Sequence, residues 1–170
     1  IASGEELDAY LEHIAPYIGW ITIYFNSLED HISDFIRMAV LRDPFQDERL
    51  DVFLSGMMFA GKAQALIDLY GQMISSASVQ KTDKELKQLQ ELLQECARRR
   101  NEYAHADWFG VRKGNFVRVK STSKRTGITH RYRVFEDSKL QADVDFICEA
   151  RFILNKFNDE VLDQLAEGAQ

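Results

Sequence analysis

The segment "ARRRNEYAHADW", residues 97–108, brings together side chains that can hold a phosphate and move a proton. A run of three arginines ends at Arg100 and is followed five residues later by His105, one of only four histidines in the chain. The arginine guanidinium is always charged and matches the oxygens of a phosphate, whereas histidine titrates near neutral pH. Together these residue types favour phosphoryl-transfer chemistry.

Cleavage of RNA without a metal ion makes demands that one histidine does not easily meet. The 2′-hydroxyl must lose a proton, the charge that grows on the phosphate must be stabilised, and the leaving 5′-oxygen must gain a proton. On a regular helix Arg98, Asn101 and His105 share one face, whereas Arg100 lies about 140° around the axis from His105. Arg100 and His105 therefore converge only if the helix unwinds between them or if two chains build the site. A twofold dimer would bring two copies of each residue to one composite site.

The same residues also have an ordinary structural interpretation. A histidine or an arginine in the last turn of a helix interacts favourably with the C-terminal end of the helix dipole. The residues alone leave this alternative open for Arg98, Arg99, Arg100 and His105. No two histidines or cysteines have the spacing of metal ligands, so we expect neither a metal site nor a cofactor.

Hydrophobic periodicity predicts four amphipathic helices, over residues 5–41, 48–74, 83–104 and 140–165. Four such helices bury their apolar stripes by packing into a bundle. With 170 residues, the chain is long enough for one domain with a hydrophobic core. We therefore predict an all-α fold, a four-helix up-and-down bundle in which residues 1–170 form a single domain.

Several residues are expected to set the ends of these helices. Pro16 should kink or divide the first helix, and Asp43-Pro44 should mark the turn after it. Thr82 or Asp83 can cap the third helix, and Glu85 can complete a capping box.

Between the third and fourth helices the period changes from helical to alternating. The stretches "NFVRVKS", residues 115–121, and "THRYRVF", residues 129–135, alternate apolar and basic residues, with "TSKRTG" between them. We predict a β-hairpin, inserted into the helical domain as residues 108–137.

This hairpin is strongly basic. Residues 108–135 hold eight basic residues and no acidic one, a charge of +8; since the whole chain carries -6, the remainder carries -14. Such a segment suits a polyanion such as RNA. Two alternatives stay open: the cations protect edge strands from aggregation, or the hairpin docks on the acidic surface of a dimer partner. The residues that we expect to contact RNA are Arg98, Arg99, Trp108, Arg112, Lys113, Arg118, Lys120, Lys124, Arg125, Arg131 and Arg133.

Composition agrees with a folded protein of the cytoplasm. Hydrophobic residues make up 45% and charged residues 28% of the chain. The longest apolar run, residues 14–25, is too short to span a bilayer and contains a proline, so we expect no membrane segment. We expect Cys96 and Cys148 to be buried thiols in a reducing compartment.

The stretch "RNEYAH", from Arg100 to His105, resembles the R-X4-6-H motif of HEPN domains, the higher eukaryotes and prokaryotes nucleotide-binding family. HEPN domains are small helical bundles with this motif near the end of the third core helix, which is its place here. The resemblance implies a metal-independent endoribonuclease that acts as a homodimer. In it Arg100 would stabilise the scissile phosphate, Asn101 would be the polar helper and His105 would transfer the proton.

The resemblance also implies a setting and partners. Many HEPN ribonucleases belong to bacterial toxin, antiphage or stress-defence systems, so the expected partners are RNA, a second copy of the chain and an antitoxin or other regulatory protein. HEPN toxins that are silenced by adenylylation carry a tyrosine two positions after the histidine, where this chain has Asp107. The alternative function is a non-catalytic HEPN-like module that binds nucleotide, RNA or a partner protein.

Overall fold

The computed structural model describes residues 3–76 and 79–168, and helices account for most of them. The helices in these ranges are α1 (Gly4–Val40), α2 (Asp51–Leu54), α3 (Phe59–Ser76), α4 (Asp83–Ala104) and α5 (Asp137–Gly168). Between α4 and α5 the chain forms an antiparallel sheet of β1 (Asp107–Arg112), β2 (Phe116–Lys124) and β3 (Gly127–Arg133). The predicted predominance of helix is confirmed.

Capping boxes begin α1 and α4. The side chain of Thr82 accepts a hydrogen bond from the backbone N–H of Glu85 at 3.2 Å, and the Glu85 carboxylate accepts one from the Thr82 N–H at 2.8 Å. Ser3 and Glu6 make the same exchange at the start of α1. Each box satisfies N–H groups that have no carbonyl partner inside the helix. The predicted cap of the third long helix is therefore confirmed.

Of the two alternatives predicted for Pro16, division of the helix was wrong, because α1 continues through Pro16, whose ring is exposed. The helix predicted over residues 48–74 is broken, since α2 ends at Leu54 and α3 begins at Phe59. The N–H of Gly56 bonds to the carbonyl of Phe53 at 3.2 Å, which closes a tight turn instead of extending the helix. Glycine favours this break because it costs about 1 kcal/mol relative to alanine within a helix.

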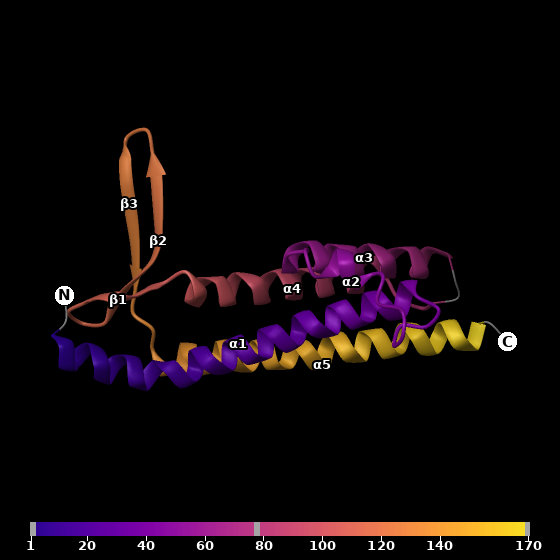
Figure 1. The fold of residues 1–170 in the computed structure, drawn as a ribbon, viewed down its shortest axis with the longest axis horizontal. Helices are drawn as coiled ribbons and strands as arrows, with labels where there is room; N and C mark the ends of the chain where they lie inside the picture. Colours follow the sequence, from indigo (N-terminus) through magenta and orange to yellow (C-terminus); the bar gives the residue numbers. More distant parts are fainter. Residues whose placement is uncertain (1–2, 77–78, 169–170) are drawn as a thin grey trace.

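The long helices lie in two layers, α1 beside α5 and α3 beside α4 (Figure 1). Phe25 packs on Phe59 with ring centroids 4.5 Å apart, and Glu29 pairs with Lys62 at 2.9 Å. Because the residue numbers rise together along both helices, α1 and α3 are parallel. The predicted up-and-down order was therefore wrong. The connection over residues 41–58 is long enough to bring the chain back before α3 begins.

Apolar side chains from all four long helices form one core. Among its most buried members are Ile14, Ile21, Leu28 and Ile32 of α1, Leu66 and Tyr70 of α3, Leu93 and Cys96 of α4, and Leu140, Ile147 and Leu154 of α5. Burying one such aliphatic side chain contributes about 1.5–3 kcal/mol. The Tyr70 hydroxyl donates to Oδ1 of Asn158 at 2.8 Å, which satisfies two polar groups inside this core. Over the described ranges, no helix is both long enough and apolar enough to cross a membrane.

The inserted segment has three strands where two were predicted. β1 pairs with the lower part of β2 through a turn in which Gly114 and Asn115 have φ of 79° and 60°, values that glycine and asparagine adopt more readily than other residues. β2 and β3 then continue as a two-stranded arm that projects away from the helices (Figure 1). Val111, Val117 and Val119 anchor the foot of the sheet in the core. The basic hairpin is thus an arm that is anchored at its foot and whose outer half projects away from the helices.

Asp143 of α5 is completely buried and ties α5 to the end of α4. Arg99 Nη1 lies 3.0 Å from its Oδ1, and the Tyr103 hydroxyl and the Lys139 ammonium group donate to its Oδ2. Burial, reinforced by the hydrogen bond to this carboxylate, raises the pKa of Tyr103 well above its ordinary value, so Tyr103 stays a neutral donor. A buried carboxylate needs such partners, because desolvation of an unpaired charge is costly.

We expect Asp143→Ala to lower the free energy of unfolding by about 3 kcal/mol, because it leaves Arg99 and Lys139 without their shared partner. Urea unfolding followed by circular dichroism measures this change. The control is Asp145→Ala, which removes an exposed carboxylate from the same helix and should cost within about 0.5 kcal/mol. Equal losses in the two variants would contradict the assigned role of Asp143.

Candidate functional site

His105 lies at the C-terminal end of α4, where the helix gives way to β1. The helix stays regular through Ala104, and the N–H of His105 still bonds to the carbonyl of Asn101 at 3.2 Å. The imidazole is exposed to solvent. His105 is therefore positioned by the helix but is not buried against its own chain, which leaves it accessible to a substrate.

The imidazole borders a hollow of about 340 Å³ in the corner between α4 and the arm. The hollow is lined by Arg98, Asn101, Glu102 and His105 of α4 and by Val119, Lys120 and Arg131 of the arm. One helix face supplies the first group because Arg98, Asn101 and His105 follow each other at steps of three and four residues. Five residues that were predicted as catalytic or as RNA contacts thus meet in one place: Arg98, Asn101, His105, Lys120 and Arg131.

Arg100 does not share this hollow. Its guanidinium lies over the ring of Phe25, 4.9 Å from the centroid, and its Nη1 donates to Oδ1 of Asn101 at 3.0 Å. Because α4 does not unwind, Arg100 and His105 of one chain stay on different sides of the helix. Asn101 contacts Arg100 and also lines the hollow beside His105.

Glu102 holds the arm against α4. Its carboxylate is buried and lies 2.9 Å from Arg133 and 3.6 Å from Arg131, both on β3. The pairing places a negative charge beside Arg133, and Arg131 lines the hollow. Glu102 was not among the residues predicted for the site, although it is the only acid between Cys96 and Ala106.

Glu95 holds two of the predicted RNA contacts. It accepts two hydrogen bonds from Arg98, both at 2.7 Å, and one from Arg99 at 2.8 Å. Arg99 also stacks on the ring of Phe146, 3.8 Å from its centroid, and is turned into the protein by Asp143. Arg98 thus remains at the rim of the hollow, whereas Arg99 is part of the helix packing.

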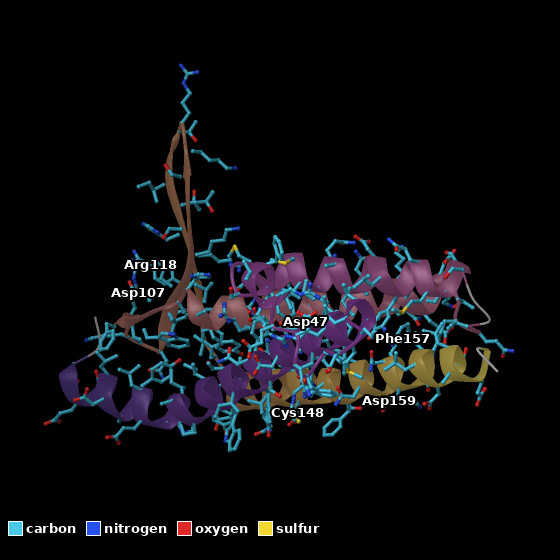
Figure 2. The ribbon with its side chains drawn as sticks, turned by 45° about the vertical axis from the view of Figure 1, so that its right-hand side comes forward. Asp47, Asp107, Arg118, Cys148, Phe157 and Asp159 are labelled. Carbon is cyan, nitrogen blue, oxygen red and sulfur yellow. The ribbon has the colours of Figure 1, made fainter. Side chains whose placement is uncertain are left out.

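The remaining cations of the insertion fall into two groups: some are paired or stacked at the foot of the arm, and the others are exposed. Arg118 pairs with Asp107 at 2.5 Å at the foot of the arm, where Figure 2 labels both residues. Arg112 lies over the ring of Tyr132, 4.1 Å from its centroid. Lys113, Lys120, Lys124 and Arg125 are exposed and make no ion pair with any residue in the described part of the chain.

Trp108 is packed between the end of α4 and the end of the sheet. Its indole N–H donates to the carbonyl of Tyr103 at 2.9 Å, and its ring packs against Tyr103 and Phe135. These contacts join the end of α4 to the end of the sheet. Trp108 is therefore less available for stacking on a base than its place in the sequence suggests.

Comparisons with known proteins add no family to this description. No protein-family model matches the sequence, and no curated protein and no solved structure matches it. Among residues 3–76 and 79–168, no group of three or more His, Cys, Asp or Glu side chains is arranged to hold a metal ion.

The Glu95 cluster predicts a dependence of stability on pH. Hydrogen bonds from Arg98, followed in effect by those from Arg99, lower the pKa of Glu95 from 4.5 to about 2. The contribution of Glu95 to the free energy of unfolding is therefore present above its unfolded pKa of 4.5. It is lost as the pH falls toward the folded pKa of about 2, because the unfolded chain takes up the proton first.

We expect the free energy of unfolding of the wild type to fall more steeply than that of Glu95→Gln between about pH 5 and about pH 3. Urea unfolding across this range measures both slopes. Glu91→Gln, an exposed residue one turn away, is the control and should keep the wild-type slope. If Glu95→Gln also kept that slope, Glu95 would not be the titrating group.

Proposed function

We propose that this protein is a HEPN-type, metal-independent endoribonuclease of a bacterial toxin, antiphage or stress-defence system, acting in the cytoplasm as a homodimer. The observation that carries the proposal is the placement of His105, exposed in a corner with Asn101, Arg98, Lys120 and Arg131. In this proposal α1, α3, α4 and α5 are the HEPN-like bundle and residues 108–137 are its insertion.

The residue types in the corner suit RNA cleavage. An exposed imidazole can take a proton from a 2′-hydroxyl or give one to a 5′-oxygen at neutral pH. Cations around it attract the phosphate and stabilise the charge that grows on it. Lys120 and Arg131 supply positive charge from the arm, and Arg98 supplies it from α4.

A second chain completes the site. One protomer offers a single imidazole, and its Arg100 is held on the other side of α4 over Phe25. Two copies related by a twofold axis bring two imidazoles and two Arg100 side chains to one cleft, which supplies an acid, a base and the phosphate-binding cations. Asn101 accepts from Arg100 and lines the hollow of His105, so it connects the two parts of the motif.

The surface for the second copy adjoins the site. A groove of about 380 Å³ runs between α3 and α4, and its apolar lining consists of Phe59, Ala60, Ala63, Ile67, Leu93 and Ala97. Its end is formed by Arg98 and Asn101, which also line the hollow of His105. Met58, beside the groove in sequence, is 82% exposed. An apolar groove with an exposed methionine beside it, next to a site, is typical of an interface.

The alternative is a non-catalytic module that binds nucleotide, RNA or a protein partner. The pairing of Arg98 with Glu95 and of Arg131 with Glu102 favours it, because each pair reduces the charge that is free to act on a phosphate. A binding module needs only the accessible corner, whereas the ribonuclease needs His105 to transfer protons.

We expect the purified protein to cut a labelled mixed-sequence RNA in the presence of EDTA and to leave 2′,3′-cyclic phosphate ends. His105→Ala should reduce the rate by about 10²–10⁴-fold, because it removes the proton-transfer group. Arg100→Ala should also reduce it. His130→Ala, which removes another exposed imidazole from the arm, is the control and should cut at the wild-type rate. Absence of cutting by a folded wild-type dimer would favour the binding module.

We expect Ala60→Arg to convert the dimer to a monomer and to abolish cleavage, because a long charged side chain enters the apolar groove. Sedimentation velocity reports the oligomeric state, and the labelled RNA reports the rate. Gln72→Arg adds the same charge to an exposed position of α3 outside the groove and should change neither. A monomer that still cuts would contradict the composite site.

A further inference from the structure

The two faces of the arm carry different side chains. In the register of β2 and β3, Lys120 is opposite Arg131, Thr122 is opposite Thr129 and Lys124 is opposite Gly127. Alternate positions of a strand share a face, so these pairs lie on one face of the arm. The other face carries Arg118 with Tyr132, Ser121 with His130 and Ser123 with Ile128.

The first of these faces turns toward α4. Arg131 approaches Glu102 of α4 at 3.6 Å, and Lys120 and Arg131 both line the hollow that His105 borders. Thr122 and Lys124 continue the same face toward the turn between β2 and β3, which is the tip of the arm. A continuous surface, which we call the arm track (Lys120, Thr122, Lys124, Thr129 and Arg131), therefore leads from the tip to the imidazole.

The chemistry of the arm track suits a sugar–phosphate backbone. It offers ammonium and guanidinium groups to phosphates and threonine hydroxyls to phosphate or ribose oxygens, and it contains no acid. It also contains no aromatic ring on which a base could stack. Tyr132 lies on the opposite face beneath Arg112, and Trp108 is packed at the foot of the sheet.

The lack of stacking residues on the arm track distinguishes between single-stranded and double-helical RNA as the ligand. Proteins that hold single strands combine positive charge with aromatic rings on which successive bases stack. Double-helical RNA is recognised mainly by its shape, its phosphates and its 2′-hydroxyl groups, without stacking. The arm track has the groups for the second mode.

The outer half of the arm has no support from the helices. From Ser123 to His130 every side chain is exposed, and an isolated two-stranded hairpin is only marginally stable in water. Protection of edge strands explains a few scattered lysines, but it does not require cations that line up on the face toward the site. A bound polyanion both neutralises and orders such a surface.

We propose that the arm track binds the sugar–phosphate backbone of a double-helical RNA segment and so places the adjoining strand beside His105. The inference rests on the proposed function for the identity of the nucleic acid as RNA. It deepens that function by naming a structured RNA, with a stem next to the scissile bond, as the substrate class.

The test measures binding of a labelled RNA duplex of about 16 base pairs by fluorescence anisotropy over a range of salt concentrations. All variants carry His105→Ala, so that cleavage does not consume the RNA. Lys120→Gln with Lys124→Gln should weaken binding about tenfold or more and should reduce the slope of log K against log salt by about 2. Both side chains are exposed, so the fold should persist.

The matched control, Lys84→Gln with Lys87→Gln, removes the same charge from exposed positions at the other end of α4 and should bind as the parent does. Equal weakening in both double variants would overturn the arm track, because only net charge would then matter. Tighter binding of a single strand, or of a DNA duplex of the same sequence, would overturn the substrate class. Arm-dependent binding of the duplex with no cleavage by the wild type would refute the ribonuclease and leave the arm track supported.

Discussion

The buried carboxylate of Asp143 sets the geometry on which the candidate site depends. It receives Arg99 and Tyr103, which lie four residues apart on one face of α4. Because a fully buried charge is tolerated only when it is paired, this contact fixes the rotation of α4 about its axis. Asn101 and His105 each follow one of these residues by two positions, about 200° around the helix, and so they point away from α5. His105 is exposed because the opposite face of α4, with Arg99 and Tyr103, packs on the buried Asp143.

A second acid, Glu102 of α4, determines the position of the arm. Glu102 is held by Arg133 and Arg131 of β3, and the valines at the foot of the sheet fill the space beside it. Arg118 and Arg133 are therefore paired at the foot of the arm, while Lys120, Lys124 and Arg125 are exposed. This division explains how one segment with a charge of +8 can both stabilise the fold and present a surface to a polyanion.

The composite site that we propose follows from a limit of helix geometry. Arg100 and His105 are five residues apart in sequence, but a regular helix separates their directions by about 140°. The structure keeps that helix regular and holds Arg100 over Phe25. Phosphate binding and proton transfer by these two residues in one cleft therefore require a second chain, and the apolar groove that ends at Asn101 offers a surface for it.

The sequence by itself determined the local features: the apolar stripes of the long helices, the capping box at Thr82, the basic hairpin and the place of His105 at the end of a helix. These follow from interactions between residues within a few positions of each other. Tertiary structure alone decided that α1 and α3 run parallel, that a third strand joins the hairpin, and which arginines are paired. Periodicity shows which face of an element is apolar but does not show its direction or its partner. Glu102 and Asp143 meet cations 31 and 44 residues away, respectively, and only the folded chain brings them together.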